Sequence, residues 1–243
     1  MWFGFTGRGV RRCGQLGGNH DASLSCGMIT KNIADNLPHM ASKLNDWATL
    51  AARAYGTYAG VNTAIAKATD KSSPAVQHAD EVRQQVALMA VIRTFAVLDR
   101  DGSVSFQPVY QFPKEDRATE LISALYAASE PPCSNEMAMA DCGKAIERFQ
   151  AEYQRINWKA FGRLQGFRNS AISHVAWGDV KKFVTYGELE ETVRICCRLA
   201  GELTLMTSGL NDWPEEDISE YQETAYTFWA AAFAAGLRGR PAE

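Results

Sequence analysis

Residues 146–177 read IERFQAEYQRINWKAFGRLQGFRNSAISHVAW, and the apolar pattern of this stretch indicates the fold class. Apolar side chains recur in this stretch at spacings of three and four residues, which places them on one stripe of an α-helix. The stripe consists of Ile146, Phe149, Tyr153, Ile156, Ala160, Leu164, Phe167 and Ala171. Because a stripe of this length must pack against other apolar surfaces, the stretch predicts one long helix in a helical protein.

The predicted helix ends in the polar cluster RNSAISH, residues 168–174. On an ideal helix Arg168 and His174 flank the apolar stripe, about 120° apart around the axis and about 9 Å apart along it. One helix cannot bring both side chains onto a small ligand, but two copies packed about a two-fold axis could. In the alternative interpretation Arg168 pairs with a carboxylate, His174 occupies a helix C-terminus that favours cations, and neither does chemistry.

The composition predicts a folded domain with no overall positive field. The chain has 243 residues, 46% of them hydrophobic and 22% charged, with a net charge of -3. These values are typical of one large globular domain or two small ones, and they exclude wholesale disorder. A net negative charge means that any contact with nucleic acid has to come from a local patch.

The cysteines and the absence of long apolar runs indicate a reduced, cytoplasmic location. None of the six cysteines has the CxxC spacing of a structural zinc site. No apolar run is long enough to span a bilayer, so no membrane contact is expected. Residues 1–27 are rich in glycine and lack periodicity, so they are expected to be a disordered tail or the product of a start codon placed too far upstream.

Further amphipathic segments follow this tail, and together they predict an all-α bundle of about five to six helices in a single domain, residues 28–243. Ser73 and Pro74 have the residue types of an N-cap and a first helical position, and Thr185 with Glu188 has the spacing of a capping box. Helices are expected at about 40–69, 74–98, from Pro113 to about 126, at 146–177, from about 185 to 209 and at 218–237. Pro108 and Pro113 predict an irregular, extended segment over 104–112.

Metal and cofactor sites are not expected. The histidines at 20, 39 and 78 are dispersed, and only His174 has a distinctive neighbourhood. Asp99, Asp101 and Gly102 are similar to the start of a calcium loop, but the later ligand positions do not follow. Neither a phosphate-binding glycine loop nor a hydrolase motif is present.

Basic residues also recur along the predicted long helix. They are Lys144, Arg148, Arg155, Lys159 and Arg163. We interpret them as a solvated face balanced by Glu147 and Glu152. As a phosphate track they would need Arg168 nearby, yet Lys159 and Arg168 lie about 180° apart around the helix axis.

The order of the elements and the RNSAISH cluster resemble the HEPN superfamily, and most closely its AbiU-type abortive-infection proteins. The signature of that superfamily is an arginine, a polar residue, a few further residues and a histidine at the end of a long helix. Arg168, Asn169 and His174 match it. The resemblance covers about residues 44–210.

The resemblance implies a homodimer in which the motifs of two subunits meet in a cleft, and often a metal-independent endoribonuclease acting in toxin–antitoxin or abortive-infection defence. His174 would act as general base or acid on the ribose 2′-OH, Arg168 would bind the scissile phosphate, and Asn169 would orient His174 or a phosphate oxygen. The expected partners are RNA, a second copy of the chain and an antitoxin. Other members of the superfamily are inactive scaffolds that bind nucleotide, nucleic acid or a protein, and this alternative stays open.

Overall fold

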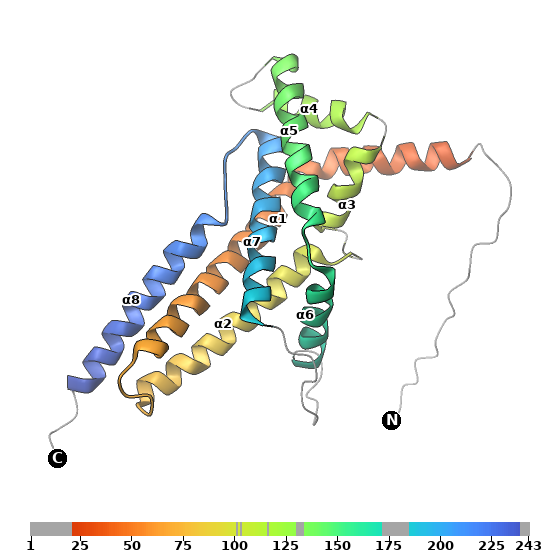
Figure 1. Ribbon diagram of the computed structural model, residues 1–243. Coiled ribbons are helices and arrows are strands. Elements are labelled where there is room, and N and C mark those ends of the chain that lie inside the picture. The colour runs from red at the N-terminus through yellow and green to blue at the C-terminus, as the bar shows by residue number, and fades with distance from the viewer. Residues whose placement is uncertain are drawn as a thin grey trace, which may run out of the picture.

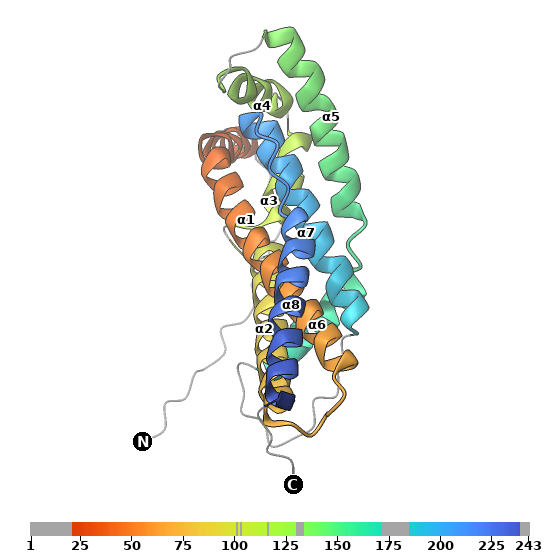
Figure 2. The same cartoon turned by 90° about the vertical axis from the view of Figure 1, so that its left-hand side faces the viewer.

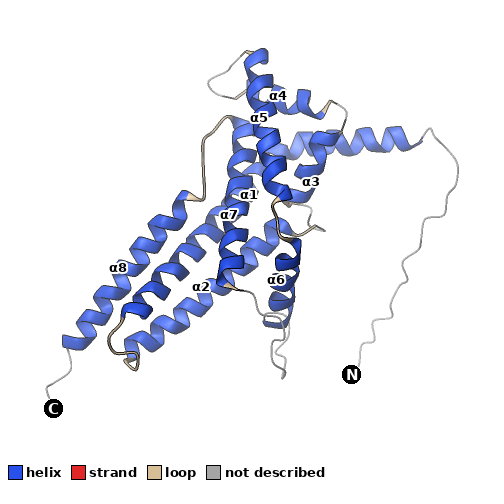
Figure 3. Ribbon diagram, in the orientation of Figure 1, coloured by secondary structure: helices blue, strands red, loops and turns tan. Residues whose placement is uncertain are grey.

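The computed structural model describes residues 21–100, 102, 104–115, 117–129, 134–171 and 185–238, with side chains from 33 onward except at 135, 167–171 and 236–238. Over these residues the chain forms eight α-helices and no strand (Figure 1, Figure 3). The helices are α1 (Asp21–Lys67), α2 (Pro74–Leu98), α3 (Phe106–Gln111), α4 (Ala118–Ala127), α5 (Asn135–Gln154), α6 (Trp158–Ala171), α7 (Tyr186–Ser208) and α8 (Glu216–Arg238), with a 3-10 turn η1 at Phe112–Lys114. The all-α prediction is confirmed, although the count exceeds five to six.

The longest helix, α1, runs along α2, α7 and α8 and changes direction near its N-terminal end (Figure 1). Pro38 lies inside it. A proline removes one backbone hydrogen bond and its ring crowds the preceding turn, so it bends a helix. Because α1 begins at Asp21, the last part of the expected tail 1–27 is helical. Viewed from the side the bundle is narrow and elongated (Figure 2).

The helix ends follow signals that the sequence carries locally. Ser73 caps α2 and its side chain accepts a hydrogen bond from the backbone N–H of Val76, with Pro74 at the first helical position. Thr185 and Glu188 form both halves of a capping box at the start of α7. Gly209 ends that helix in the left-handed region, at φ 67°, a conformation that glycine adopts at little cost. All three predicted boundaries are confirmed.

The core is built around α7. The apolar periodicity of the sequence places Leu189, Val193, Cys196, Ala200, Leu203 and Leu210 on one inward face, and the first five are all buried. Leu210 is 58% exposed, because the helix has already ended at Ser208. Each of α1, α2, α4, α5 and α6 contacts α7.

The predicted single helix over 146–177 is wrong, because the chain breaks between Gln154 and Trp158. Asn157 caps the new helix α6: its Oδ1 accepts a hydrogen bond from the N–H of Ala160 at 3.0 Å. Asparagine is a preferred N-cap residue. The apolar periodicity nevertheless continues across the break, because Tyr153, Ile156 and Phe161 pack into the same core cluster.

The segment expected to be extended over 104–112 is also helical. It forms α3 followed by η1, and α4 starts at Ala118 and not at Pro113. Pro108 is tolerated because it lies in the first turn of α3, where backbone N–H groups have no partner within the helix. Phe106 and Phe112 are buried, so burial of their rings stabilises a conformation that the prolines alone do not predict.

A close backbone approach joins α1 to α8. A Cβ atom added at Gly56 would lie 2.4 Å from the carbonyl oxygen of Ile218, and one added at Gly60 would lie 2.2 Å from that of Gln222. Only glycine permits this approach at both positions. None of the described helices is both long enough and apolar enough to cross a membrane.

We expect Gly60→Ala to lower the free energy of unfolding by about 1–3 kcal/mol, because the new methyl group must push the α8 backbone away. The matched control is Gly162→Ala in α6, where a Cβ atom would meet nothing within 4 Å. That change should raise stability by about 0.5–1 kcal/mol through helix propensity. Urea unfolding followed by circular dichroism measures both variants. Equal stability of the two would contradict the close approach.

Candidate functional site

The motif predicted to carry function lies at the end of α6. Arg168 and Asn169 are in the last turn of that helix, and their side chains are outside the described residues. His174 falls in the segment 172–184, which is also outside them. The structure therefore locates the helix that carries the first two motif residues, and the contact between Arg168 and His174 stays a prediction.

The body of α6 is held firmly against the bundle. The ring of Phe161 stacks on Phe95 of α2, with centroids 5.3 Å apart and planes at 7°. Leu164 is 1% exposed in a cluster with residues of α1, α2 and α7. Arg163 pairs with Glu188 in the first turn of α7. These contacts set the direction of α6, whose last turn contains Arg168 and Asn169.

The basic residues along α5 and α6 are largely engaged within the protein. Arg148 binds both carboxylate oxygens of Glu202 on α7, at 2.6 and 2.9 Å. Arg155 pairs with Glu152 at 2.8 Å. These pairs agree with the interpretation that the basic face is balanced by carboxylates. However, Arg148 and Arg163 pair with carboxylates of α7, and of the three arginines only Arg155 pairs with a carboxylate of α5.

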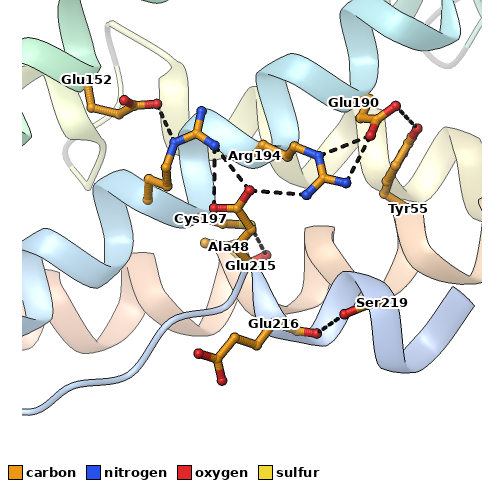
Figure 4. A network of polar contacts seen from close by, with 10 residues as sticks. Ala48, Tyr55, Glu152, Glu190, Arg194, Cys197, Glu215, Glu216 and Ser219 are labelled. Carbon is orange, nitrogen blue, oxygen red and sulfur yellow. Dashed lines mark hydrogen bonds and ion pairs between the residues drawn. The ribbon is translucent and has the colours of Figure 1, made fainter.

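A larger network joins α7 to three other parts of the chain (Figure 4). Glu215, just before α8, accepts hydrogen bonds from both Arg194 and Arg198 at 3.1 Å. Arg198 also binds Glu152 of α5 at 2.6 Å, and Arg194 binds Glu190 one turn earlier at 3.0 Å. The sequence showed that the two arginines are one turn apart, and only the fold shows that one carboxylate bridges them.

Tyr55 extends this network to α1. Its hydroxyl donates to Glu190 Oε2 at 2.9 Å. Burial raises the pKa of Tyr55 above its ordinary value, and the hydrogen bond to Glu190 adds to the shift. Every carboxylate in the network, Glu152, Glu190 and Glu215, already accepts hydrogen bonds from an arginine. The geometry therefore suits a structural tie between helices better than general acid or base chemistry.

The buried cysteines do not offer a nucleophile. Cys142, Cys196 and Cys197 are free thiols with no exposed surface. Burial raises the pKa of both Cys196 and Cys197, which keeps them protonated, whereas the thiolate is the reactive form. Among the residues that the structure describes, no three His, Cys, Asp or Glu side chains gather closely enough to hold a metal ion.

Replacing Glu152 by glutamine should destabilise the protein by about 1–3 kcal/mol, because two guanidinium groups lose their charged partner in a partly buried setting. The Glu152 side chain is 11% exposed. Glu147→Gln changes the same charge on the exposed side of α5 and should stay within about 0.5 kcal/mol of wild type. Thermal or urea unfolding of the two variants tests this. If they unfold alike, the network contributes little.

We expect alkaline pH to destabilise the protein in a way that depends on Tyr55. The unfolded phenol ionises near pH 10, whereas the pKa of folded Tyr55 is raised. Above about pH 10 the unfolded chain therefore binds fewer protons than the native state, and stability falls by up to about 1.4 kcal/mol per pH unit for this group. Tyr55→Phe should make the fall shallower between about pH 9 and about pH 11, measured as urea midpoints. An unchanged slope would contradict the assignment.

The chain matches no protein-family model, and searches of curated proteins and of solved structures find no match. What the protein does has to be inferred from its own side chains and their geometry.

Proposed function

We propose that the protein is a metal-independent endoribonuclease of the HEPN type, acting in defence as a toxin or abortive-infection protein through a site shared by two subunits. The position of the motif carries the proposal. Arg168 and Asn169 lie in the last turn of α6, a helix of an all-α bundle whose body is fixed by Phe161, Leu164 and Arg163. A polar motif at the end of a rigid helix is a suitable place for a catalytic constellation.

The residue types fit cleavage of RNA without a metal ion. His174 has an imidazole that can accept the proton of the ribose 2′-OH or donate one to the departing 5′-oxygen at neutral pH. Arg168 can bind the scissile phosphate through two N–H groups and offset the charge that develops in the transition state. Asn169 can orient the imidazole or a phosphate oxygen. Attack of the 2′-oxygen on phosphorus expels the 5′-oxygen and leaves a 2′,3′-cyclic phosphate.

The proposed site needs two subunits. If the chain continues as a helix to residue 174, Arg168 and His174 lie about 9 Å apart along the axis and on different sides of it. A two-fold axis near the end of α6 would place the arginine of one subunit beside the histidine of its partner. Among the described helices, α6 lies at the edge of the bundle (Figure 1).

One observation favours a second candidate function, an inactive HEPN scaffold that binds nucleotide, nucleic acid or a protein partner. Arg148, Arg155 and Arg163 are paired with carboxylates of the same chain. Ion pairing reduces the positive potential that would guide RNA along α5 and α6 to the motif. A scaffold with a protein partner such as an antitoxin does not need that potential.

The test is incubation of the purified protein with single-stranded RNA in EDTA. Wild type should cleave the RNA and leave 2′,3′-cyclic phosphate ends. His174→Ala should lower the rate by about 100-fold or more, the usual contribution of a general acid or base. Arg168→Ala should lower it by about 100-fold or more, because a donor to the developing charge is lost. Light scattering should show a dimer for all three proteins.

Lys159→Ala is the matched control, because Lys159 is an exposed cation on the same helix but outside the motif. It should cleave at close to the wild-type rate. The nuclease proposal is rejected if wild type leaves the RNA intact. If the His174→Ala dimer also still binds RNA or a protein partner, the scaffold function takes its place. A strict monomer would remove the shared site.

A further inference from the structure

A cavity of about 270 Å³ lies between the bent part of α1 and the end of α2. His39, Lys43 and Trp47 of α1 line one side of it, at intervals of four residues. Val97 in the last turn of α2 and Val104 in the following segment line the other side. Pro38 directly precedes His39, so the cavity lies where the proline bends α1. The bend accounts for space that two straight, packed helices would close.

The walls of the cavity are mostly apolar and partly open to solvent. Trp47 is 41% exposed and Val104 is 38% exposed, whereas Val97 and Leu44 are each 1% exposed. Large apolar groups at the mouth of a cavity lose contact with water when a ligand covers them, which favours binding. The flat indole of Trp47 is suited to a flat or extended apolar body.

The side chains of Lys43 and His39 have no hydrogen-bond or ion-pair partner in the part of the chain that the structure describes. Lys43 and His39 are one turn apart on α1 and both line the cavity. Asp35 and Asp46 belong to the same helix, yet neither forms an ion pair with Lys43 or His39. The ammonium group of Lys43 is therefore free to bind an anion, and the imidazole of His39 can donate a hydrogen bond to it.

A second cavity, of about 230 Å³ between the ends of α1 and α8, provides a contrast. It is also mostly apolar and contains one lysine, Lys67. The ammonium group of Lys67 already lies over the ring of Tyr226, 4.6 Å from its centroid, and bonds the hydroxyl of that residue at 3.4 Å. Lys43 makes no such contact with any residue that the structure describes, so of these two cavities the one at the α1 bend offers the unengaged cation.

We propose that this cavity binds a small amphipathic monoanion, an aromatic or medium-chain carboxylate whose apolar body lies against Trp47, Val97 and Val104 while its carboxylate binds Lys43 and His39. The volume admits a two-ring aromatic or a short acyl chain, and it is too small for a folded macromolecular segment. The carboxylate of the ligand pairs with the ammonium group of Lys43 and does not have to displace a carboxylate of the described chain. This site is separate from the proposed nuclease motif, and the inference does not depend on that proposal.

The experiment compares two probes of nearly equal size, 2-naphthoate and 2-naphthalenemethanol, by titration calorimetry with the full chain. Wild type should bind the naphthoate at least about tenfold more tightly than the alcohol, a difference of about 1.4 kcal/mol. Lys43→Met keeps the aliphatic stem and should remove this preference, lowering naphthoate affinity about tenfold and leaving the alcohol unchanged. Trp47→Ala should weaken both probes.

Lys67→Met is the matched control, since it removes a lysine of the same helix that lines the second cavity, and it should leave both affinities unchanged. The proposal is overturned if wild type does not discriminate between the probes. It is also overturned if naphthoate affinity follows Lys67 and not Lys43, or if binding is unaffected by Lys43→Met and Trp47→Ala. Both substituted positions are partly exposed, and matching thermal unfolding midpoints would show that the variants are folded.

Discussion

The structure depends on the burial of α7 on almost all sides. Fourteen of its residues are buried, and they include Thr192, Glu202, Thr204 and Thr207 besides the apolar ones. Burying a charged group costs free energy unless a partner compensates it. Glu202 is 6% exposed and is compensated by the two hydrogen bonds from Arg148. The central helix therefore requires particular side chains on its neighbours.

The same requirement explains why arginines and glutamates concentrate between α1, α5, α7 and the start of α8. Arg194 of α7 points toward Glu215 in the turn before α8 (Figure 4). Arg198 of α7 binds the same carboxylate and that of Glu152 on α5. Because Glu215 lies just before α8 and binds both arginines, it fixes where α8 starts relative to α7. The glycines of α1 then allow α8 to pack along α1 with its backbone in direct contact. Ion pairs give this arrangement its register, and close packing gives it most of its contact area.

Two departures from regular helix geometry create the places where function is proposed. The break at Asn157 separates α6 from α5, so α6 packs independently against α2 and α7 and carries Arg168 at its end. The bend at Pro38 leaves a cavity beside Lys43 and Trp47. In both places the chain gives up backbone hydrogen bonds within a helix, and in both it gains a surface that a straight helix would not present.

Local sequence signals determined the helical class and many of the helix ends. The Ser73 cap, the Thr185 and Glu188 box and Gly209 act through hydrogen bonds between residues at most four apart, so they could be predicted without the fold. The predicted apolar stripe is buried wherever its residues are described, but it did not show the break at Asn157, because both helices bury their apolar residues in one core. The partners of Arg148 and Arg198, and the glycine contact between α1 and α8, join residues from 46 to more than 150 positions apart. Only the tertiary structure decided them, because periodicity specifies which face of a helix is apolar but not which helix covers it.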